Sequence, residues 1–527
     1  MSTNVVNLDA LIPREDITVE DQAPPTKALE SISIVHLEGP FFGPDLRKPD
    51  FQRETVQWTP AKVVDLLRAF VDADLIPAVI LWRAGRNLFV VDGAHRLSAL
   101  LAWIFDDYGD RKKSLEYFGG HITDDQRKVA ERTRLLVNKE IGSYAEYLAA
   151  RSNPDGAPEK LRKRLSNLSV NHIIAQWVPA TDPKSAEASF FKINQAATPI
   201  DATEKRILKA RRSASAIAAR AITHGGTGHK YWSSFANESR TAIERIGESI
   251  FRSLYDPPIN GMPVTTLDVP VAGRGYNALP FIFDLVNEAN GVMVADTSTK
   301  KAIKETLPDD LDGSITLAYL RAVAKRIERI TGDTPMSLGL HPVVYFYSRS
   351  GVFQPLAFLA ASIFVEQLAS SKQLDDFKRV RQQFEEFLVD HKEAISLVIH
   401  RLGTGARSLP WIVKYYQLVL HGFFSGRSAQ QVQQDIAADS DFAFVTAPRP
   451  SMARPESTKT KRPFNSGTKS ATYFSQALPG CIRCAICGAR VHRNSLHVDH
   501  IQRVRDQGSA DMKNGQVTHP YCDSSKG

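Results

Sequence analysis

Side chains that can bind metal ions are concentrated at the end of this chain of 527 residues, where all four cysteines lie within residues 481–527. Cys484 and Cys487 are separated by two residues, and so are His519 and Cys522. One turn lets both side chains of such a pair reach a single ion, so the spacing predicts a tetrahedral Cys3His shell, which suits structural zinc. Cys481 is left over, either as a substitute for Cys484 or as a buried thiol.

A short segment between the two pairs alternates like a β-strand. Residues 496–501 read Leu-His-Val-Asp-His-Ile, and a turn-rich stretch follows them as far as Asn514. Successive side chains of a strand point to opposite faces, so Asp499 and His500 are expected to face opposite ways. For His497 we expect a packing or supporting role beside the site.

The order of these residues resembles the HNH nuclease motif over residues 481–527. The resemblance implies a ββα-metal fold, in which zinc fixes a small hairpin and a helix. It also implies that His500 is the general base that takes a proton from water, and that Asn514 braces the loop presenting it. Asp499 and Asp523 would hold a divalent cation.

Hydrolysis of a phosphodiester needs this division of labour. The negative charge of the phosphodiester repels a nucleophile, and the alkoxide leaving group is poor without a Lewis acid. Carboxylate oxygens suit magnesium or manganese, whereas thiolates suit zinc. In this family a cysteine is common at the position of His519, and histidine or asparagine at that of Asp523. Both replacements preserve metal ligation.

A second interpretation treats the tail as a zinc-stabilised nucleic-acid-binding module without catalysis. Four cysteine or histidine ligands alone would favour it. The Asp499-His500 pair, with Asn514 and Asp523 at their spacing, favours the nuclease. A secreted disulfide scaffold is excluded, because such proteins spread cysteines through the fold.

The N-terminal region has a second chemically informative pattern. An apolar helix is expected over residues 60–70, then strands over 78–82 and 88–91 joined by a turn at 84–87. Asp92-Gly93-Ala94-His95-Arg96 separates the second strand from another helix that ends at Phe105. A strand, a glycine turn and a helix start bring backbone amides where they can meet an anion, and Arg96 adds charge.

These segments resemble the ParB/sulfiredoxin-like N-terminal domains of GmrSD-type restriction proteins, with their Gln-Arg and Asp-Gly-Gln-x-Arg motifs. Residues 190–195, Phe-Phe-Lys-Ile-Asn-Gln, resemble the asparagine segment of that family. The resemblance implies a switch that binds or hydrolyses ATP, GTP or CTP, upstream of a nuclease that acts on foreign or modified DNA. The residues that it assigns to nucleotide binding are Gln52, Arg53, Asp92, Gly93, His95, Arg96 and Asn194.

Local patterns allow a simpler interpretation of the same residues. Asp92-Gly93 could form an ordinary turn, and Arg53 could pair with Asp92 for structural reasons. No Gly-x4-Gly-Lys-Ser/Thr loop occurs in the chain, so any NTPase would need another mechanism. A glycine-rich stretch at residues 225–230 has the wrong spacing for a phosphate loop and is expected to be a loop.

Composition sets the class of protein. Hydrophobic residues make up 43% and charged residues 24%, as in soluble globular proteins. The formal net charge of +8 is compatible with a nucleic-acid partner, and six basic residues against one acid fall in the stretch 448–469. The N-terminus lacks the pattern of a signal peptide, and the longest apolar run, 355–365, is too short for a bilayer. We therefore expect a cytoplasmic protein without a membrane partner.

Together the patterns predict an α+β multidomain protein. The expected parts are a ParB-like sensor domain over 1–220, a mostly helical domain over 221–445, a basic flexible linker over 446–475 and an HNH nuclease domain over 476–527. The expected activity is metal-dependent cleavage or nicking of DNA in defence against phage or foreign DNA, with structural zinc, catalytic magnesium or manganese, and an NTP. A homo-oligomer or a partner protein of a defence system is compatible with it. The competing class is a nucleotide-responsive, DNA-binding regulator without enzymatic activity.

Overall fold

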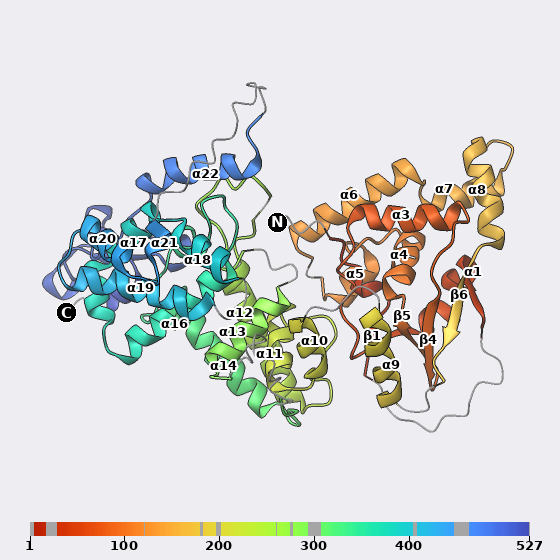
Figure 1. Cartoon of the computed structure of the whole chain (residues 1–527), viewed down its shortest axis with the longest axis horizontal. Helices are drawn as coiled ribbons and strands as arrows, with labels where there is room; N and C mark the ends of the chain where they lie inside the picture. Colours follow the sequence, from red (N-terminus) through yellow and green to blue (C-terminus); the bar gives the residue numbers. More distant parts are fainter. Residues whose placement is uncertain are drawn as a thin grey trace. The chain divides into compact units, whose positions relative to one another are not determined.

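A six-stranded mixed sheet forms the centre of the N-terminal part of the chain (Figure 1). Its strand order is β1-β3-β5-β4-β6-β2. Strands β4 and β5 are antiparallel and pair from Ile80 with Asp92 to Ala84 with Asn87, while β3 with β5 and β4 with β6 are parallel. The strand bounds are β1 Arg14–Glu15, β2 Ser31–Ser33, β3 Leu46–Pro49, β4 Val79–Ala84, β5 Asn87–Asp92 and β6 His172–Trp177.

The computed structural model describes residues 5–16, 29–120, 122–179, 183–196, 202–259, 261–273, 278–292, 307–403, 408–446 and 463–525. The chain divides into two compact units. The N-terminal unit comprises residues 2–244 and 306–316, and the C-terminal unit comprises Met1, 245–305 and 317–527. Among the described residues, no helix is both long and apolar enough to cross a membrane.

Helices cover both faces of the sheet. The larger core packs side chains such as Val64, Leu67 and Leu100 against Leu81 and Val90. The smaller core is formed by the alternate strand residues, whose side chains point to the other face of the sheet. It joins Trp82 and Phe89 to Phe190. The helices of this unit are α1 Ile34–Glu38, α2 Phe42–Asp45, α3 Pro60–Val71, α4 Ala94–Phe105, α5 Lys112–Tyr117, α6 Asp124–Glu140, α7 Tyr144–Ser152, α8 Glu159–Val170, α9 Pro183–Ala196, α10 Ala202–Lys209 and α11 Ala214–Thr223.

The expected elements around the Asp-Gly motif are confirmed. Thr59 caps α3 by accepting a hydrogen bond from the backbone N–H of Lys62, and Pro60 occupies the first turn, where its missing N–H costs nothing. Helix α4 begins directly after Gly93, whose φ of 96° lies in the left-handed region. A β-carbon at this position would lie 2.5 Å from Val79 Cγ1, so the turn needs glycine for space as well.

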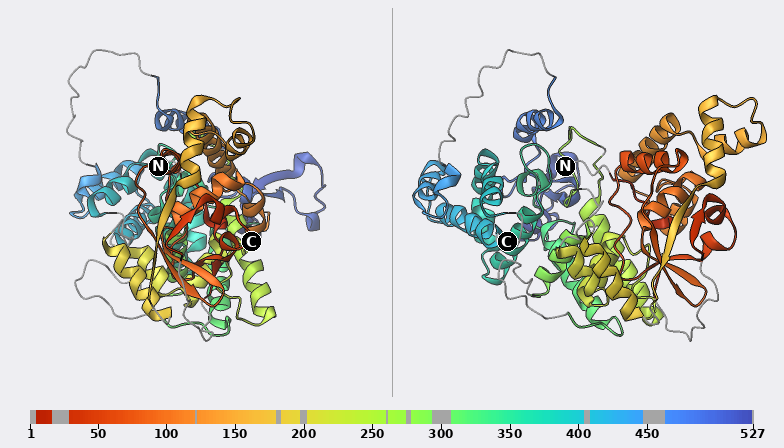
Figure 2. Two further views of the ribbon diagram at one scale, coloured as in Figure 1. Left: turned by 90° about the vertical axis from the view of Figure 1, so that its right-hand side faces the viewer. Right: turned by 45° about the vertical axis from the view of Figure 1, so that its right-hand side comes forward.

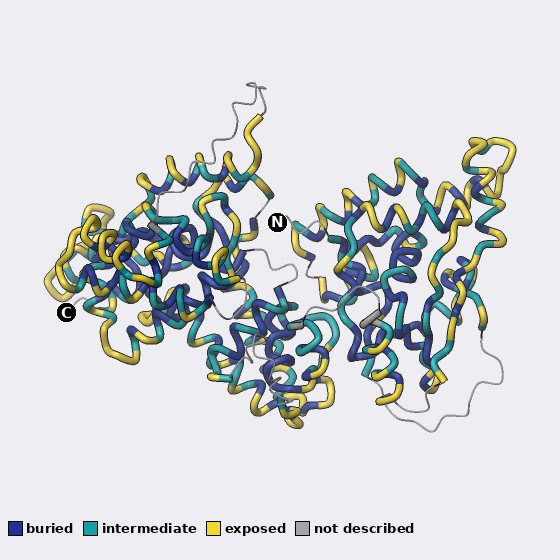
Figure 3. Tube along the Cα trace, viewed as in Figure 1, coloured by how far each residue is buried: buried dark blue, intermediate teal, exposed yellow. Residues whose placement is uncertain are grey.

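The C-terminal unit is helical up to its last segment. Phe377, Phe384 and Phe387 lie on the buried side of α17, as their spacing predicts. The helices are α12 Asn237–Tyr255 and α14 Ser314–Ile330, which both begin in the other unit, and α13 Leu279–Ala289, α15 Pro342–Tyr345, α16 Pro355–Ser370, α17 Leu374–Asp390, α18 Ala394–Leu402, α19 Leu409–Phe424, α20 Ala429–Ala438, α21 Ala443–Thr446 and α22 Ser466–Ala477. Buried residues form the inner turns of these helices and the central strands of the sheet (Figure 3).

The end of the chain forms a small β-hairpin followed by a short helix. Strands β7 His497–His500 and β8 Gly515–Thr518 are antiparallel, and α23 Pro520–Ser524 follows. The hairpin and its loop project from the helices of this unit in the left view of Figure 2. This order, two strands and then a helix, is the one that the HNH resemblance implies. Within the expected linker, residues 466–475 are helical because they belong to α22, which Asn465 caps.

Candidate functional site

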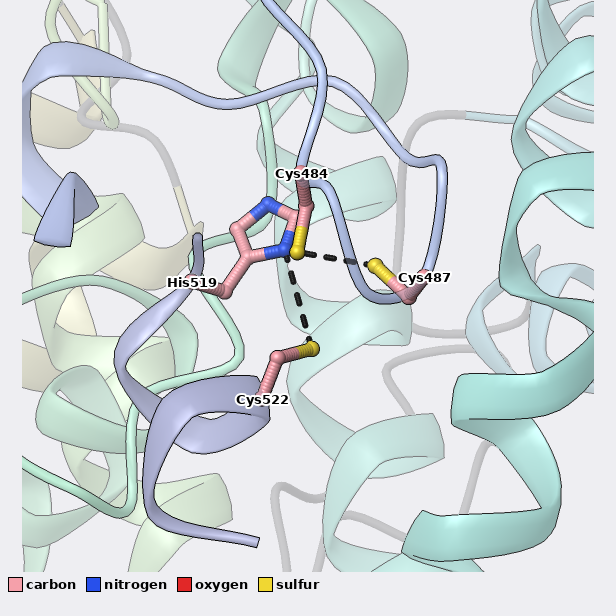
Figure 4. Close-up of side chains that lie close together, drawn as sticks. All are labelled: Cys484, Cys487, His519 and Cys522. Atoms are coloured by element: carbon pink, nitrogen blue, oxygen red, sulfur yellow. Dashed lines mark hydrogen bonds between the residues drawn. The ribbon is translucent and has the colours of Figure 1, made fainter. Parts of the chain in front are cut away.

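Four buried side chains from two segments meet at the end of the C-terminal unit (Figure 4). Cys484 and Cys487 lie in a tight turn in which Gly488 N donates to Cys484 O and Cys484 N donates to Ala489 O. His519 precedes α23 and Cys522 lies within it. The ligand atoms of these four residues all lie within 4.8 Å of one another. The grouping that the two-residue spacing predicts is therefore confirmed.

Hydrogen bonds fix which nitrogen of His519 faces the thiols. Nε2 lies 3.0 Å from the carbonyl oxygen of Arg490, which can only accept, so Nε2 carries the proton. Nδ1 then has the free lone pair, and it lies 3.4 Å from Cys487 Sγ and 3.9 Å from Cys522 Sγ. Burial lowers the pKa of His519 below its usual value, which keeps the imidazole neutral. A neutral Nδ1 beside three thiols is a donor set that fits zinc.

Hydrogen bonds within the cluster shift the pKa values of its thiols in opposite directions. Hydrogen bonds from Cys487 and Cys522 lower the pKa of Cys484, whereas the hydrogen bond to Cys484 raises the pKa of Cys487 to about 11. The pKa of Cys522 is raised for the same reason. Metal binding must therefore displace protons from these two thiols. Cys481 is separate from the cluster, with its Sγ 3.8 Å from Val491 O.

Helix α17 supplies buried charges beside this cluster. Arg381 is 1% exposed, donates to Glu385 at 2.9 Å, and lies 3.4 Å from His519 Nδ1. Burial lowers the pKa of Arg381, but the carboxylate of Glu385, with smaller contributions from other neighbours, outweighs it and raises the pKa above its usual value. Three thiolates and a neutral imidazole around Zn²⁺ would carry a net charge of −1, and Arg381 presents its guanidinium beside them while pairing with Glu385. Glu385 also accepts from the backbone N–H of Arg490 at 3.1 Å.

The hairpin carries the residues that the HNH resemblance assigns to catalysis. Asp499 pairs with Gln516 and His500 pairs with Gly515 across the two strands. The side-chain amide of Gln516 donates to Asp499 Oδ2 at 3.0 Å. Asp499 and His500 are both half-buried on successive positions of β7, so they belong to opposite faces, as the alternation predicts.

Asn514 holds the loop that follows His500. Its Oδ1 accepts from the backbone N–H of Gln502 at 2.7 Å, and its Nδ2 donates to the carbonyl oxygens of Gln502 and Ser509. The amide of Asn514, at the end of the loop, is thus hydrogen-bonded to Gln502 at its start and to Ser509 within it. This geometry is what a brace requires, and a catalytic role for Asn514 stays a prediction.

Asp523 lies on α23, which is anchored although it is short. Tyr521 N donates to Ser337 O at 2.9 Å, and Lys378 Nζ donates to Ser525 Oγ at 2.9 Å. Ser524 Oγ donates to Pro335 O at 3.1 Å. The carboxylate of Asp523 lies 3.2 Å from His497 Nδ1. The helix end is thus held by loop 331–339 and by α17, contacts that the motif does not reveal.

In the N-terminal unit the Asp-Gly motif has structural partners of its own. Arg96 donates to Asp92 Oδ2 at 2.7 Å and to the carbonyl oxygen of Ala78 at 3.1 Å. The partner of Asp92 is therefore Arg96, and not Arg53 as the simpler interpretation suggests. Arg53 is half-buried, close enough to His95 to help lower the pKa of that imidazole.

Three of the residues assigned to nucleotide binding carry a buried polar atom without a hydrogen-bond partner among the described residues. These atoms are Gln52 Oε1, His95 Nε2 and Arg96 Nε. The ring of His95 stacks on Trp58, with 5.5 Å between centroids. Burial, followed by the charges of Arg53 and Lys48, lowers the pKa of His95 to about 3. His95 is therefore neutral near pH 7, and its free nitrogen can accept or donate a hydrogen bond.

A buried charge network lies next to these residues, and the sequence patterns did not reveal it. Lys48 is 0% exposed and donates to the carbonyl oxygen of Asp9 at 2.7 Å and to Thr55 Oγ1 at 3.1 Å. Asp9 also forms ion pairs with Lys48 and Arg14. The Asp9 carboxylate accepts from Thr55 N at 3.0 Å. No local pattern singles out Lys48, which follows Arg47 in β3, because its partner Asp9 is 39 residues away in the sequence.

The remaining residue of the expected nucleotide site is Asn194. It falls within α9, and its side chain lies outside the described residues.

Comparison with protein families matches both ends of the chain. Residues 37–212 match the family described as "GmrSD restriction endonuclease, N-terminal domain", and residues 484–527 match the family "HNH endonuclease". No curated protein and no solved structure matches the chain. The HNH match spans the Cys3His cluster, the hairpin and α23, and the other match spans the Asp-Gly motif. The chain therefore combines a GmrSD-type N-terminal domain with a C-terminal HNH endonuclease domain.

Proposed function

We propose that this protein is a metal-dependent DNA endonuclease or nickase of a restriction system that acts on phage or other foreign DNA. One observation carries the proposal. The Cys3His cluster is buried and self-contained, while Asp499, His500 and Asp523 lie on the adjoining hairpin and helix and are not needed for it. A zinc module that only bound DNA would not require this second set of residues.

The roles follow from the chemistry of the side chains. His500 takes a proton from the attacking water, and Asn514 holds the loop behind it. Asp499 and Asp523 offer carboxylate oxygens, which suit magnesium or manganese. When bound there, the cation supplies a Lewis acid that offsets phosphate charge and stabilises the leaving oxygen. The thiols and His519 suit zinc, whose place is to hold the turn at Cys484 against α23.

The N-terminal domain is proposed to be a nucleotide-responsive switch or sensor. Support comes from the unpartnered atoms of Gln52 and His95 and from the neighbouring buried cations, Lys48 and Arg14. These groups can meet the hydrogen-bonding atoms and the negative charge of a nucleotide. Coupling to the nuclease requires that the nucleotide prefer one of two states of the protein.

The test is to incubate plasmid DNA and phage DNA with the full chain, with and without Mg²⁺ or Mn²⁺ and with each of ATP, GTP and CTP. We expect cation-dependent nicking or cleavage that EDTA abolishes. DNA binding without any cleavage under all of these conditions would instead support the non-enzymatic regulator.

Replacing Asp523 with alanine is expected to separate the two metals. Zinc content should stay at the wild-type level, because Asp523 is not part of the Cys3His cluster. Cleavage with Mg²⁺ should fall by a factor on the order of 10² or more, as a carboxylate that holds the cation is lost. Zinc analysis and a plasmid-nicking assay on the same preparation measure both. Loss of zinc from Asp523→Ala would contradict the assignment of separate ligands to zinc and to the catalytic cation.

Replacing Arg96 with alanine is expected to weaken nucleotide binding at least about tenfold, since a guanidinium beside a glycine turn is a phosphate partner. Calorimetry with ATP, GTP and CTP measures the change. Arg86→Ala is the matched control, because Arg86 is exposed on the β4–β5 turn. If Arg96→Ala and Arg86→Ala bind the nucleotides with equal affinity, Arg96 is not part of the nucleotide site. If the wild type binds no nucleotide while cutting DNA, the domain is better interpreted as a DNA-recognition module.

A further inference from the structure

His497 makes two contacts that together restrict the state of its ring. Nε2 lies 2.8 Å from the backbone carbonyl oxygen of Asp333, and Nδ1 lies 3.2 Å from Asp523 Oδ2. A carbonyl oxygen can only accept, so Nε2 carries a proton. In the neutral ring, Nδ1 then presents a lone pair to a carboxylate oxygen that also presents lone pairs. Something positive must lie between them, either a proton or a metal ion.

The separation of these two atoms fits two neighbouring ligands of one cation. Ligands at about 2.1 Å from an octahedral ion lie about 3 Å apart along each edge of the octahedron. Both side chains are partly open, 29% exposed for His497 and 34% for Asp523, so a hydrated ion can reach them. A backbone carbonyl or carboxylate on the far nitrogen is also the usual way in which proteins orient an imidazole that binds a metal.

We infer that His497 is a direct ligand of the catalytic cation, through Nδ1, and that it forms a two-residue clamp with Asp523. This inference rests on the proposed function. It changes the sequence-based expectation, in which His497 has a packing or supporting role, and it adds His497 to the proposed cation ligands Asp499 and Asp523. In the described part of the chain, the Cys3His cluster is the group of three or more such side chains close enough to share a metal ion.

The contact with Asp333 gives the clamp a fixed position. Loop 331–339 also contacts Ser495, since Gly332 N donates to Ser495 Oγ at 2.9 Å, and it accepts from Tyr521 N through Ser337. The same loop thus holds the start of β7 and the start of α23. The two ligands of the clamp, His497 on β7 and Asp523 on α23, lie on the two elements that this loop contacts.

An imidazole ligand should alter metal preference. Carboxylate and water suit Mg²⁺, whereas nitrogen ligands favour ions later in the first transition row. The wild type is expected to bind Mn²⁺, Co²⁺ or Ni²⁺ more tightly than Mg²⁺. The variant His497→Asp is expected to shift that preference towards Mg²⁺.

The decisive experiment detects the nitrogen itself. Pulsed electron paramagnetic resonance on Mn²⁺ bound to the zinc-loaded full chain reports a directly coordinated ¹⁴N, and ¹⁵N-labelled histidine identifies it as imidazole. We expect this coupling in the wild type and in His500→Ala, and its loss in His497→Ala with Mn²⁺ affinity at least about tenfold lower. His400→Ala, at an exposed position of α18, is the matched control. His497→Gln retains a donor for the Asp333 carbonyl and covers the case in which alanine disturbs the fold.

Each outcome decides the matter. Imidazole coupling that survives in both His497→Ala and His497→Gln, or that is absent from the Mn²⁺-loaded wild type, overturns the inference and makes His497 a salt-bridge partner of Asp523. A wild type that binds no Mn²⁺ also overturns it. The cleavage assay separates these results from the proposed function, because DNA can be cut without nitrogen ligation, and nitrogen ligation can be present without cutting.

Discussion

Replacing His500 with alanine is expected to lower the rate of DNA cleavage by a factor on the order of 10² or more, the usual contribution of a general base. His500 is half-buried at the end of β7, directly before the loop that Asn514 closes, and it is not one of the four clustered ligands. Zinc content and the folded state should therefore be unchanged. Single-turnover cleavage of a supercoiled plasmid at saturating Mg²⁺ measures the chemical step.

The control for this variant is a change on the same hairpin that leaves the base in place. Val498, two positions before His500 on β7, is 68% exposed, and Val498→Ala removes only two methyl groups from solvent. That variant is expected to cut at the wild-type rate. Should His500→Ala also cut at the wild-type rate, with zinc content and melting temperature intact, another group must accept the proton of the attacking water.

Replacing Cys487 with serine is expected to release zinc, unfold the hairpin and α23, and abolish cleavage. A serine oxygen is a poor zinc ligand, and small zinc modules draw their folding free energy from the metal. The effect should extend into the helices of the same unit. Arg381 and Glu385 are 1% and 0% exposed beside the cluster, so unfolding of the zinc module would change the surroundings of a buried ion pair on α17.

Zinc analysis and thermal unfolding of the purified variant measure this prediction. Cys481→Ser is the matched control, because Cys481 stands outside the cluster, with its Sγ 3.8 Å from Val491 O. It should keep full zinc and activity. Full zinc in Cys487→Ser, or lost zinc in Cys481→Ser, would contradict the ligand assignment. The full chain is the right material, since α17 and loop 331–339 supply many of the hydrogen bonds of the zinc module.

Features that depend on spacing along the chain could be predicted from the sequence. Two pairs of ligands with two residues between them identified the Cys3His cluster, because one turn forces such a pair together. Alternation from 496 to 501 identified β7, and the turn at 84–87 identified the β4–β5 hairpin. The apolar repeat on α17 and the glycine at position 93 were likewise local signals.

Tertiary structure alone decided which distant residues complete each site. Lys48 binds Asp9, which is 39 positions away in the sequence. Arg381 contacts His519 at a separation of 138 positions, and the Asp333 carbonyl contacts His497 at a separation of 164. No periodicity encodes such pairs, because they depend on how separate elements pack against one another. The most specific case is the carbonyl of Asp333. A backbone oxygen has no signature in the sequence, yet by fixing the proton on Nε2 it leaves Nδ1 of His497 facing Asp523, and so decides what that histidine can bind.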